Sequence, residues 1–108
     1  MLDWNISAPE LKARLDRGEK LLLLDVREPW EHQLARLEGS VLIPLREIQS
    51  RNGEIDSEAE IVVLCHHGVR SMMALNYLRQ QGFKKLKNLA GGIDAWSLLV
   101  DPRIPRYR

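Results

Sequence analysis

Two continuous apolar runs constrain the fold of this chain more than any other feature. Residues 21–26 and Ile61–Leu64 are apolar almost without interruption, with Asp25 as the exception. A half-buried strand would alternate apolar and polar residues, so continuous runs indicate strands buried on both faces, as in a parallel sheet between helices. A short apolar run at 41–43 and the segment Leu86–Leu89 raise the number of predicted strands to four.

Helical patterns separate these strands. Ser7 can cap a helix, Glu10 stands at the capping-box position, and Gly18 is a natural stop. Further helical spacing is found at 28–37, at 45–51, at 71–81 and after Gly91-Gly92. Alternating strands and helices predict an α/β fold, with a small, mainly parallel sheet flanked by helices on both faces.

Length and charge limit the classes of function. A chain of 108 residues predicts one domain, 1–108, whose residues 101–108 form an extended tail carrying three solvated arginines, Arg103, Arg106 and Arg108. A net charge of +1 provides no general attraction for nucleic acid or anionic membranes. No apolar run approaches the ~20 residues that span a bilayer, and no export signal is seen. We therefore expect a cytoplasmic protein.

The only cysteine, Cys65, stands where parallel-sheet proteins bind ligands. It follows the predicted strand Ile61–Leu64 and precedes a predicted helix. Ligands bind beyond the carboxyl ends of such strands, and helix N-termini stabilise negative charge. A thiol placed there is expected to lose its proton more easily than a free thiol, whose pKa is about 8.5. The position predicts a nucleophilic thiolate.

The residues after the cysteine are suited to hold an anion. Gly68 permits a tight turn whose N–H groups converge, and Arg70, beside the predicted helix cap Ser71, adds a permanent charge. His66 and His67 are expected at the rim. Because adjacent side chains tend to point apart, these histidines with a single cysteine make a poor metal set, and we expect no metal.

Several other residues are interpreted as structural. Asp25 and Arg27 are expected to form a charge pair that ties the end of the first strand to neighbouring loops. Trp30, Tyr77 and Trp96 are interpreted as core aromatics.

At four places the chain resembles rhodanese domains, a family of sulfurtransferases. Residues 65–71, Cys-His-His-Gly-Val-Arg-Ser, resemble the family's active-site loop, and residues 24–28 resemble its N-terminal signature. Residues 39–44 and 90–96 match two further segments in the family order. The resemblance covers nearly the whole chain and implies a single-domain rhodanese. The family often has Gly-His before the third of these segments, whereas this chain has none, so we assign no function there.

The resemblance implies a sulfurtransferase that works through a persulfide on Cys65. A donor such as thiosulfate would give its outer sulfur to the cysteine, and cyanide, a small thiol or a protein cysteine would accept it. The N–H groups of the loop would stabilise the persulfide, which assigns substrate binding to five residues: His66, His67, Gly68, Val69 and Arg70. Neither metal nor organic cofactor is implied.

Loop length distinguishes this chemistry from that of related enzymes. Four residues separate Cys65 from Arg70, whereas related phosphatases and arsenate reductases carry one more. A tighter ring of N–H groups suits one sulfur atom rather than a tetrahedral oxyanion. Two alternatives stay open: a persulfide carrier for a partner protein with little turnover of its own and, less favoured, a phosphatase or arsenate reductase. The sequence does not identify the physiological donor, the acceptor or the oligomeric state.

Overall fold

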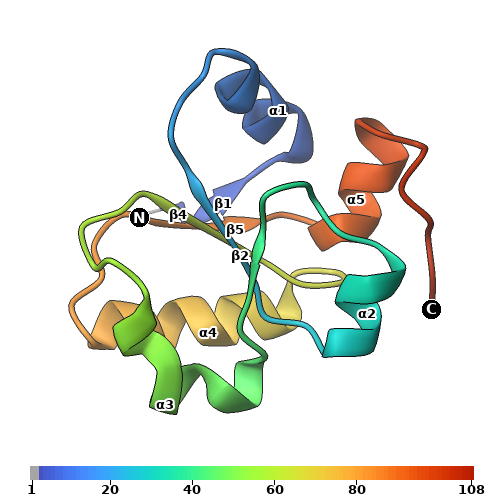
Figure 1. Cartoon of the computed structure of the whole chain (residues 1–108). Coiled ribbons are helices and arrows are strands. Elements are labelled where there is room, and N and C mark those ends of the chain that lie inside the picture. The colour runs from blue at the N-terminus through green and yellow to red at the C-terminus, as the bar shows by residue number, and fades with distance from the viewer. Residues whose placement is uncertain (1–2) are drawn as a thin grey trace.

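A computed structural model describes residues 3–108 and shows one parallel five-stranded sheet (Figure 1). The strand order is β1-β5-β4-β2-β3, and every pair of neighbours is parallel. The strands are β1 (Asn5–Ile6), β2 (Leu22–Asp25), β3 (Val41–Leu42), β4 (Ile61–Leu64) and β5 (Leu86–Leu89). The predicted α/β class with a parallel sheet is confirmed.

Helices cover both faces of this sheet. They are α1 (Ala8–Asp16), α2 (Pro29–Leu34), α3 (Ile48–Arg51), α4 (Val69–Gln80) and α5 (Gly92–Leu99), with 3₁₀ turns at Leu45–Glu47 and Asn52–Glu54. In Figure 1, α3 and α4 lie on one side of the sheet and α1 and α5 on the other. None of the helices in the described part of the chain is long and apolar enough to cross a membrane.

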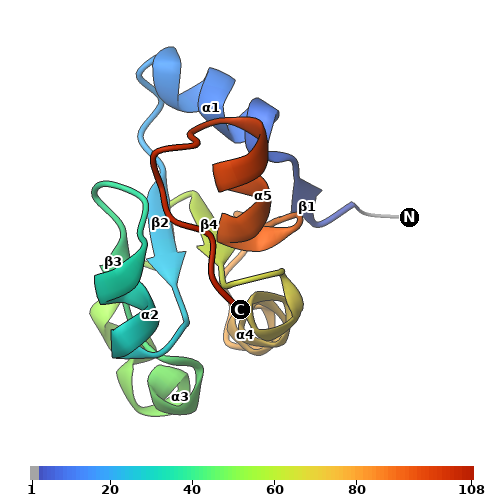
Figure 2. The ribbon, with the colours of Figure 1, turned by 90° about the vertical axis from the view of Figure 1, so that its right-hand side faces the viewer.

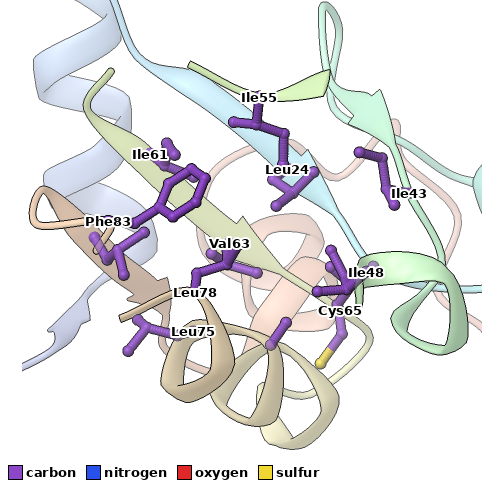
Figure 3. Packing of buried hydrophobic residues seen from close by; sticks show 13 residues of the cluster. Leu24, Ile43, Ile48, Ile55, Ile61, Val63, Cys65, Leu75, Leu78 and Phe83 are labelled. Carbon is purple, nitrogen blue, oxygen red and sulfur yellow. The ribbon is translucent and has the colours of Figure 1, made fainter. Parts of the chain in front are cut away.

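The packing of the central strand β4 explains why its residues do not alternate between apolar and polar. Ile61 and Val63 pack in the core layer next to α3 and α4, whereas Val62 and Leu64 pack in the layer next to α1 and α5. All four are at most 1% exposed. Burial on both faces makes every position apolar, as predicted. Cys65 continues the alternation into the α4 layer, where Figure 3 shows its side chain beside Ile48.

The first helix begins as its sequence predicts. The Ser7 hydroxyl accepts a hydrogen bond from the Glu10 N–H, and the Glu10 carboxylate accepts one from the Ser7 N–H. These reciprocal bonds satisfy two N–H groups that a helix start leaves without partners.

Strand β1 was missed by the sequence analysis, which predicted four strands. It has two residues, and it is held by backbone bonds from Asn88 N–H to Trp4 O and from Ala90 N–H to Ile6 O. Such bonds leave no side-chain pattern in a segment this short.

Two predicted helix bounds are wrong. The helix predicted over 28–37 ends at Leu34, because Ala35 has extended backbone angles. Helix α4 begins at Val69 rather than Ser71, so Ser71 lies inside its first turn and is not its cap.

One predicted core aromatic is also misplaced. Trp96 is 7% exposed and Tyr77 packs against the α4 layer, but the Trp30 side chain is 57% exposed. Trp30 lies in the first turn of α2, where its ring meets the C-terminal segment edge to face rather than the core.

Candidate active site

The sulfur of Cys65 lies among hydrogen-bond donors at the start of α4. The Gly68 N–H donates to Sγ at 3.0 Å and the Ser71 N–H donates to it at 3.4 Å. The Ser71 hydroxyl oxygen lies 3.3 Å from the same sulfur. Cys65 itself is 1% exposed. N–H groups directed at a sulfur in the first turn of a helix stabilise negative charge on it.

Gly68 gives the turn its shape. Its φ is +109°, a left-handed conformation that favours glycine. A Cβ at this position would meet only ordinary contacts, the nearest being Asn88 Nδ2 at 3.5 Å. Backbone conformation, rather than lack of space, therefore requires glycine here.

Asn88 of β5 supports this turn, and the sequence analysis did not single it out. Its Nδ2 donates to Gly68 O at 3.3 Å, and its Oδ1 accepts a hydrogen bond from the Ser71 hydroxyl. That hydroxyl has one proton, so donating it to Asn88 leaves its oxygen free to accept from the Cys65 thiol. Asn88 is 3% exposed, but it stands beside Lys87 in the sequence, so no local pattern distinguished it as a buried polar residue.

The start of α5 holds the cysteine loop from the other side. The Ile93 N–H donates to Cys65 O at 2.8 Å, and the Asp94 N–H donates to His66 O at 3.1 Å. A Cβ on Gly92 would lie 2.3 Å from His66 O. Only glycine allows the two backbones to come this close.

Arg70 forms an ion pair with Glu31 of α2. Its Nη1 and Nη2 donate to the two carboxylate oxygens at 2.6 and 2.8 Å. The Glu31 side chain is 4% exposed and that of Arg70 is 35% exposed. This pairing with Glu31, which the sequence analysis missed, keeps Arg70 at the loop and partly open to solvent.

The electrostatics of this pair follow from burial and from donated hydrogen bonds. Burial alone would raise the pKa of Glu31, but hydrogen bonds from Arg70, the Glu28 backbone and Tyr107 outweigh it and lower the pKa to about 2. The pKa of Arg70 is raised, chiefly because Arg70 donates hydrogen bonds to Glu31. Both groups are charged at neutral pH.

The two histidines of the loop lie parallel, so the prediction that they point apart is wrong. The ring centroids of His66 and His67 are 3.9 Å apart, and the Tyr107 ring stacks on the other face of His66 at 3.9 Å. Burial in this stack, followed by the effect of His67, lowers the pKa of His66. The lowered pKa favours the neutral form of the His66 imidazole.

The same histidines belong to a group that could bind a cation. Ligand atoms of His66, His67 and Asp94 lie within 4.8 Å of one another. Arg106, however, donates to both oxygens of Asp94, at 2.9 and 3.0 Å. A guanidinium on the only carboxylate of the group competes with a metal ion.

Asp25 and Arg27 form the buried charge pair that was predicted. Arg27 Nε and Nη2 donate to the two Asp25 oxygens at 2.9 and 2.7 Å, and both side chains are fully buried. His32 Nδ1 lies 2.8 Å from Asp25 Oδ2. The pair ties the end of β2 to α2, beside Glu31.

The C-terminal segment 101–108 folds back over this edge of the sheet. Figure 2 shows it descending from α5 in front of the sheet and ending in front of α4. Its three arginines are exposed, as predicted, but Tyr107 between them contacts the site. With His66, His67 and Asp94, the segment lines an open pocket of about 540 Å³. The sequence analysis missed this contact because nothing near Tyr107 in the sequence indicates it.

Comparisons with known proteins point to one family of domains. The rhodanese-like domain model matches residues 7–99. In Bacillus subtilis, "Putative sulfur carrier protein YrkF" is 41% identical over 85% of this chain and 50% of its own length. An Allochromatium vinosum sulfurtransferase is 37% identical over 85% of this chain and 86% of its own.

A solved structure shows the same fold. The crystal structure of a rhodanese-related protein from Thermoplasma volcanium superimposes with a TM-score of 0.83 at 28% identity, covering 95% of this chain and 98% of the other. The chain spans half or less of several of the curated relatives that it matches.

Proposed function

Because this chain belongs to the rhodanese-like domain family, we propose that it moves a sulfane sulfur from an anionic donor to a thiophilic acceptor through a persulfide on Cys65. Sulfur transfer in general is supported by the family and by relatives named as a sulfur carrier and a sulfurtransferase. The single observation that carries the persulfide is the position of the Cys65 sulfur between the N–H groups of Gly68 and Ser71.

The first step forms one bond and breaks one. The Cys65 thiolate attacks the outer sulfur of thiosulfate, the S–S bond of thiosulfate breaks, and sulfite leaves with the electron pair. The product is a Cys65 persulfide anion. The N–H groups that stabilise negative charge on the first sulfur are fixed before the reaction, so they need no rearrangement when charge moves to the second.

The second step returns the cysteine to its starting state. An acceptor thiolate or cyanide attacks the outer sulfur of the persulfide. The S–S bond between this sulfur and Cys65 breaks, and the Cys65 thiolate leaves. Splitting the transfer in this way is covalent catalysis. Neither step needs a metal, an oxidant or a reductant. In the first step, Arg70 attracts the anionic donor, because a third of its side chain is open to solvent.

A mass measurement tests the proposal. Incubating the protein with thiosulfate is expected to add the mass of one sulfur atom, which cyanide then removes as thiocyanate. Because Cys65 is the only cysteine, Cys65→Ala must abolish the adduct. The proposal is wrong if no cyanolysable sulfur appears on the wild-type protein or if the alanine variant retains it.

A carrier role is the second candidate, and the relative named as a sulfur carrier favours it. A carrier would form the same persulfide but pass its sulfur slowly to cyanide and rapidly to a protein cysteine. Comparing single-turnover rates of the loaded protein with cyanide, a small thiol and a protein thiol distinguishes the two roles. Turnover of an aryl phosphate that is lost in Cys65→Ser would instead indicate a phosphatase.

A further inference from the structure

Tyr107 meets the site through both its ring and its hydroxyl. The ring stacks on His66 with an angle of 8° between the planes, and Trp30 packs against it edge to face at 5.8 Å. The hydroxyl accepts a hydrogen bond from Arg27 Nη1 at 2.8 Å and donates one to Glu31 Oε1 at 2.8 Å. A tyrosine 76 residues beyond Glu31 in the sequence thus joins a buried arginine to a buried carboxylate.

The hydroxyl fills the last position on that carboxylate. Glu31 Oε2 accepts from Arg70 Nη1 and from the Glu28 N–H, and Oε1 accepts from Arg70 Nη2 and from Tyr107. Two donated bonds on each oxygen fix the carboxylate in one orientation, and a fixed carboxylate fixes the planar guanidinium paired with it.

We propose that Tyr107 is a positioning residue of the sulfur-transfer site, with its hydroxyl fixing the Glu31 carboxylate that orients Arg70 and its ring fixing His66. The proposal rests on the proposed function, in which Arg70 attracts the anionic donor. The tyrosine touches neither the donor nor the sulfur that moves. It acts through the ion pair.

The direction of the effect follows from the charges. Glu31 neutralises part of the charge of Arg70, and the Tyr107 hydroxyl in turn draws electron density from Glu31. Removing the hydroxyl leaves Arg70 as the only donor on Oε1 and removes an acceptor from the buried Arg27. Without the donated bond, Glu31 is less fixed in orientation and its undiminished negative charge offsets more of the charge of Arg70. Less positive potential therefore acts on an incoming anion.

Tyr107→Phe is the direct test, because it keeps the stacked ring and removes only the hydroxyl. We expect the KM for thiosulfate to rise about 3- to 10-fold, the range for the net contribution of one ordinary hydrogen bond, with kcat changed less than about twofold. Tyr77→Phe is the matched control. It deletes the same atom from a tyrosine of α4 that packs against the core, and both constants should stay at their wild-type values.

Alkylation of Cys65 gives a readout that does not require sulfur transfer. Iodoacetate is anionic and iodoacetamide is neutral, so the ratio of their rates reports the potential at the only cysteine of the chain. That ratio is expected to fall about threefold or more in Tyr107→Phe and to stay unchanged in Tyr77→Phe. Tyr107→Ala, which also removes the ring, should lower it at least as much.

The outcomes separate this proposal from the proposed function. If Tyr107→Phe leaves both the alkylation-rate ratio and the KM unchanged, the positioning role is wrong. This holds even if the substitution lowers the melting temperature. A wild-type protein that forms no persulfide overturns the proposed function, but the alkylation ratio still decides whether Tyr107 acts on Arg70.

Discussion

Two neighbouring strand-to-helix turns of this molecule have the same local design and different roles. Strand β4 leads through Gly68 into α4, and β5 leads through Gly91 into α5; both glycines are left-handed, with φ of +109° and +75°. In the first turn, N–H groups point at the Cys65 sulfur. In the second, N–H groups of α5 bind the carbonyls of Cys65 and His66. The first turn surrounds the sulfur that we propose to react, and the second holds the first turn in place.

This difference shows that a helix N-terminus is not a site by virtue of its geometry alone. The N–H groups of α5 are occupied by backbone carbonyls, whereas two at the start of α4 point at a side-chain sulfur. What the donors contact decides the role of each turn, and substitutions in the two turns test this difference.

The largest effect is expected where the two turns touch. In Gly92→Ala the added Cβ would lie 2.3 Å from His66 O, and φ of +63° adds strain. Together these should cost roughly 3 kcal/mol or more of unfolding free energy and abolish the persulfide. Denaturant unfolding measures the cost. Gly53→Ala, with ordinary φ and nothing within 4 Å of its Cβ, is the control. Equal stability of the two variants would contradict the close approach.

Each turn also has an ion pair, Arg70–Glu31 for α4 and Arg106–Asp94 for α5. Glu31→Gln should cost roughly 2 kcal/mol at pH 7, less than a fully buried pair because Arg70 is partly exposed. Asp94→Asn should cost less than about 1 kcal/mol, because the Arg106 side chain is 55% exposed.

Low pH should remove the difference in stability between the wild-type protein and Glu31→Gln. The folded pKa of Glu31, about 2, lies below an unfolded value near 4.3, so its contribution is complete above the unfolded value and is lost as pH falls towards 2. Wild type and Glu31→Gln should therefore converge in stability between about pH 4.5 and 2. Unfolding curves at several pH values measure this, and a constant gap down to pH 2 would refute it.

A third prediction separates backbone strain from chemistry. Gly68→Ala should cost about 1–2 kcal/mol for its left-handed conformation, since its Cβ has room. Gly82→Ala, with φ of +96° and an open Cβ position, should cost a similar amount far from the sulfur. Only Gly68→Ala should slow alkylation of Cys65. If both variants slow it equally, the turn has no special part in activating the thiol.

The smallest effect is expected from removing the Ser71 hydroxyl, which lies between the Cys65 sulfur and Asn88 of β5. Ser71→Ala leaves Asn88 Oδ1 without its donor, at a cost of about 1 kcal/mol, and removes the oxygen that accepts from the Cys65 thiol. Because that bond stabilises the neutral thiol, alkylation of Cys65 should become about threefold faster. Ser97→Ala, at an equally buried serine of α5, should leave the alkylation rate unchanged. If Ser71→Ala is alkylated at the wild-type rate, the Ser71 hydroxyl does not influence the reactivity of Cys65.

The resemblance of four segments to rhodanese domains already implied the fold, and local patterns placed the cysteine loop. The bounds of the four predicted strands were correct to within one residue, because burial on both faces of the central strands leaves a direct mark on composition. A two-residue strand such as β1, held by backbone pairing, leaves no such mark on the sequence. The exposed Trp30 shows that the presence of an aromatic residue does not reveal where its ring packs.

The sequence by itself determined the order of four strands and the helices between them, the position of Cys65 after a buried strand, and a tight turn at Gly68. These depend on neighbours within a few residues, whose physical preferences can be recognised locally. Only the tertiary structure decided that Glu31 orients Arg70 and that Tyr107 contacts both Glu31 and His66. Those partners are 39 or more residues apart, and only the packing of α2, α4 and the C-terminal segment at one edge of the sheet brings their charges and rings within reach.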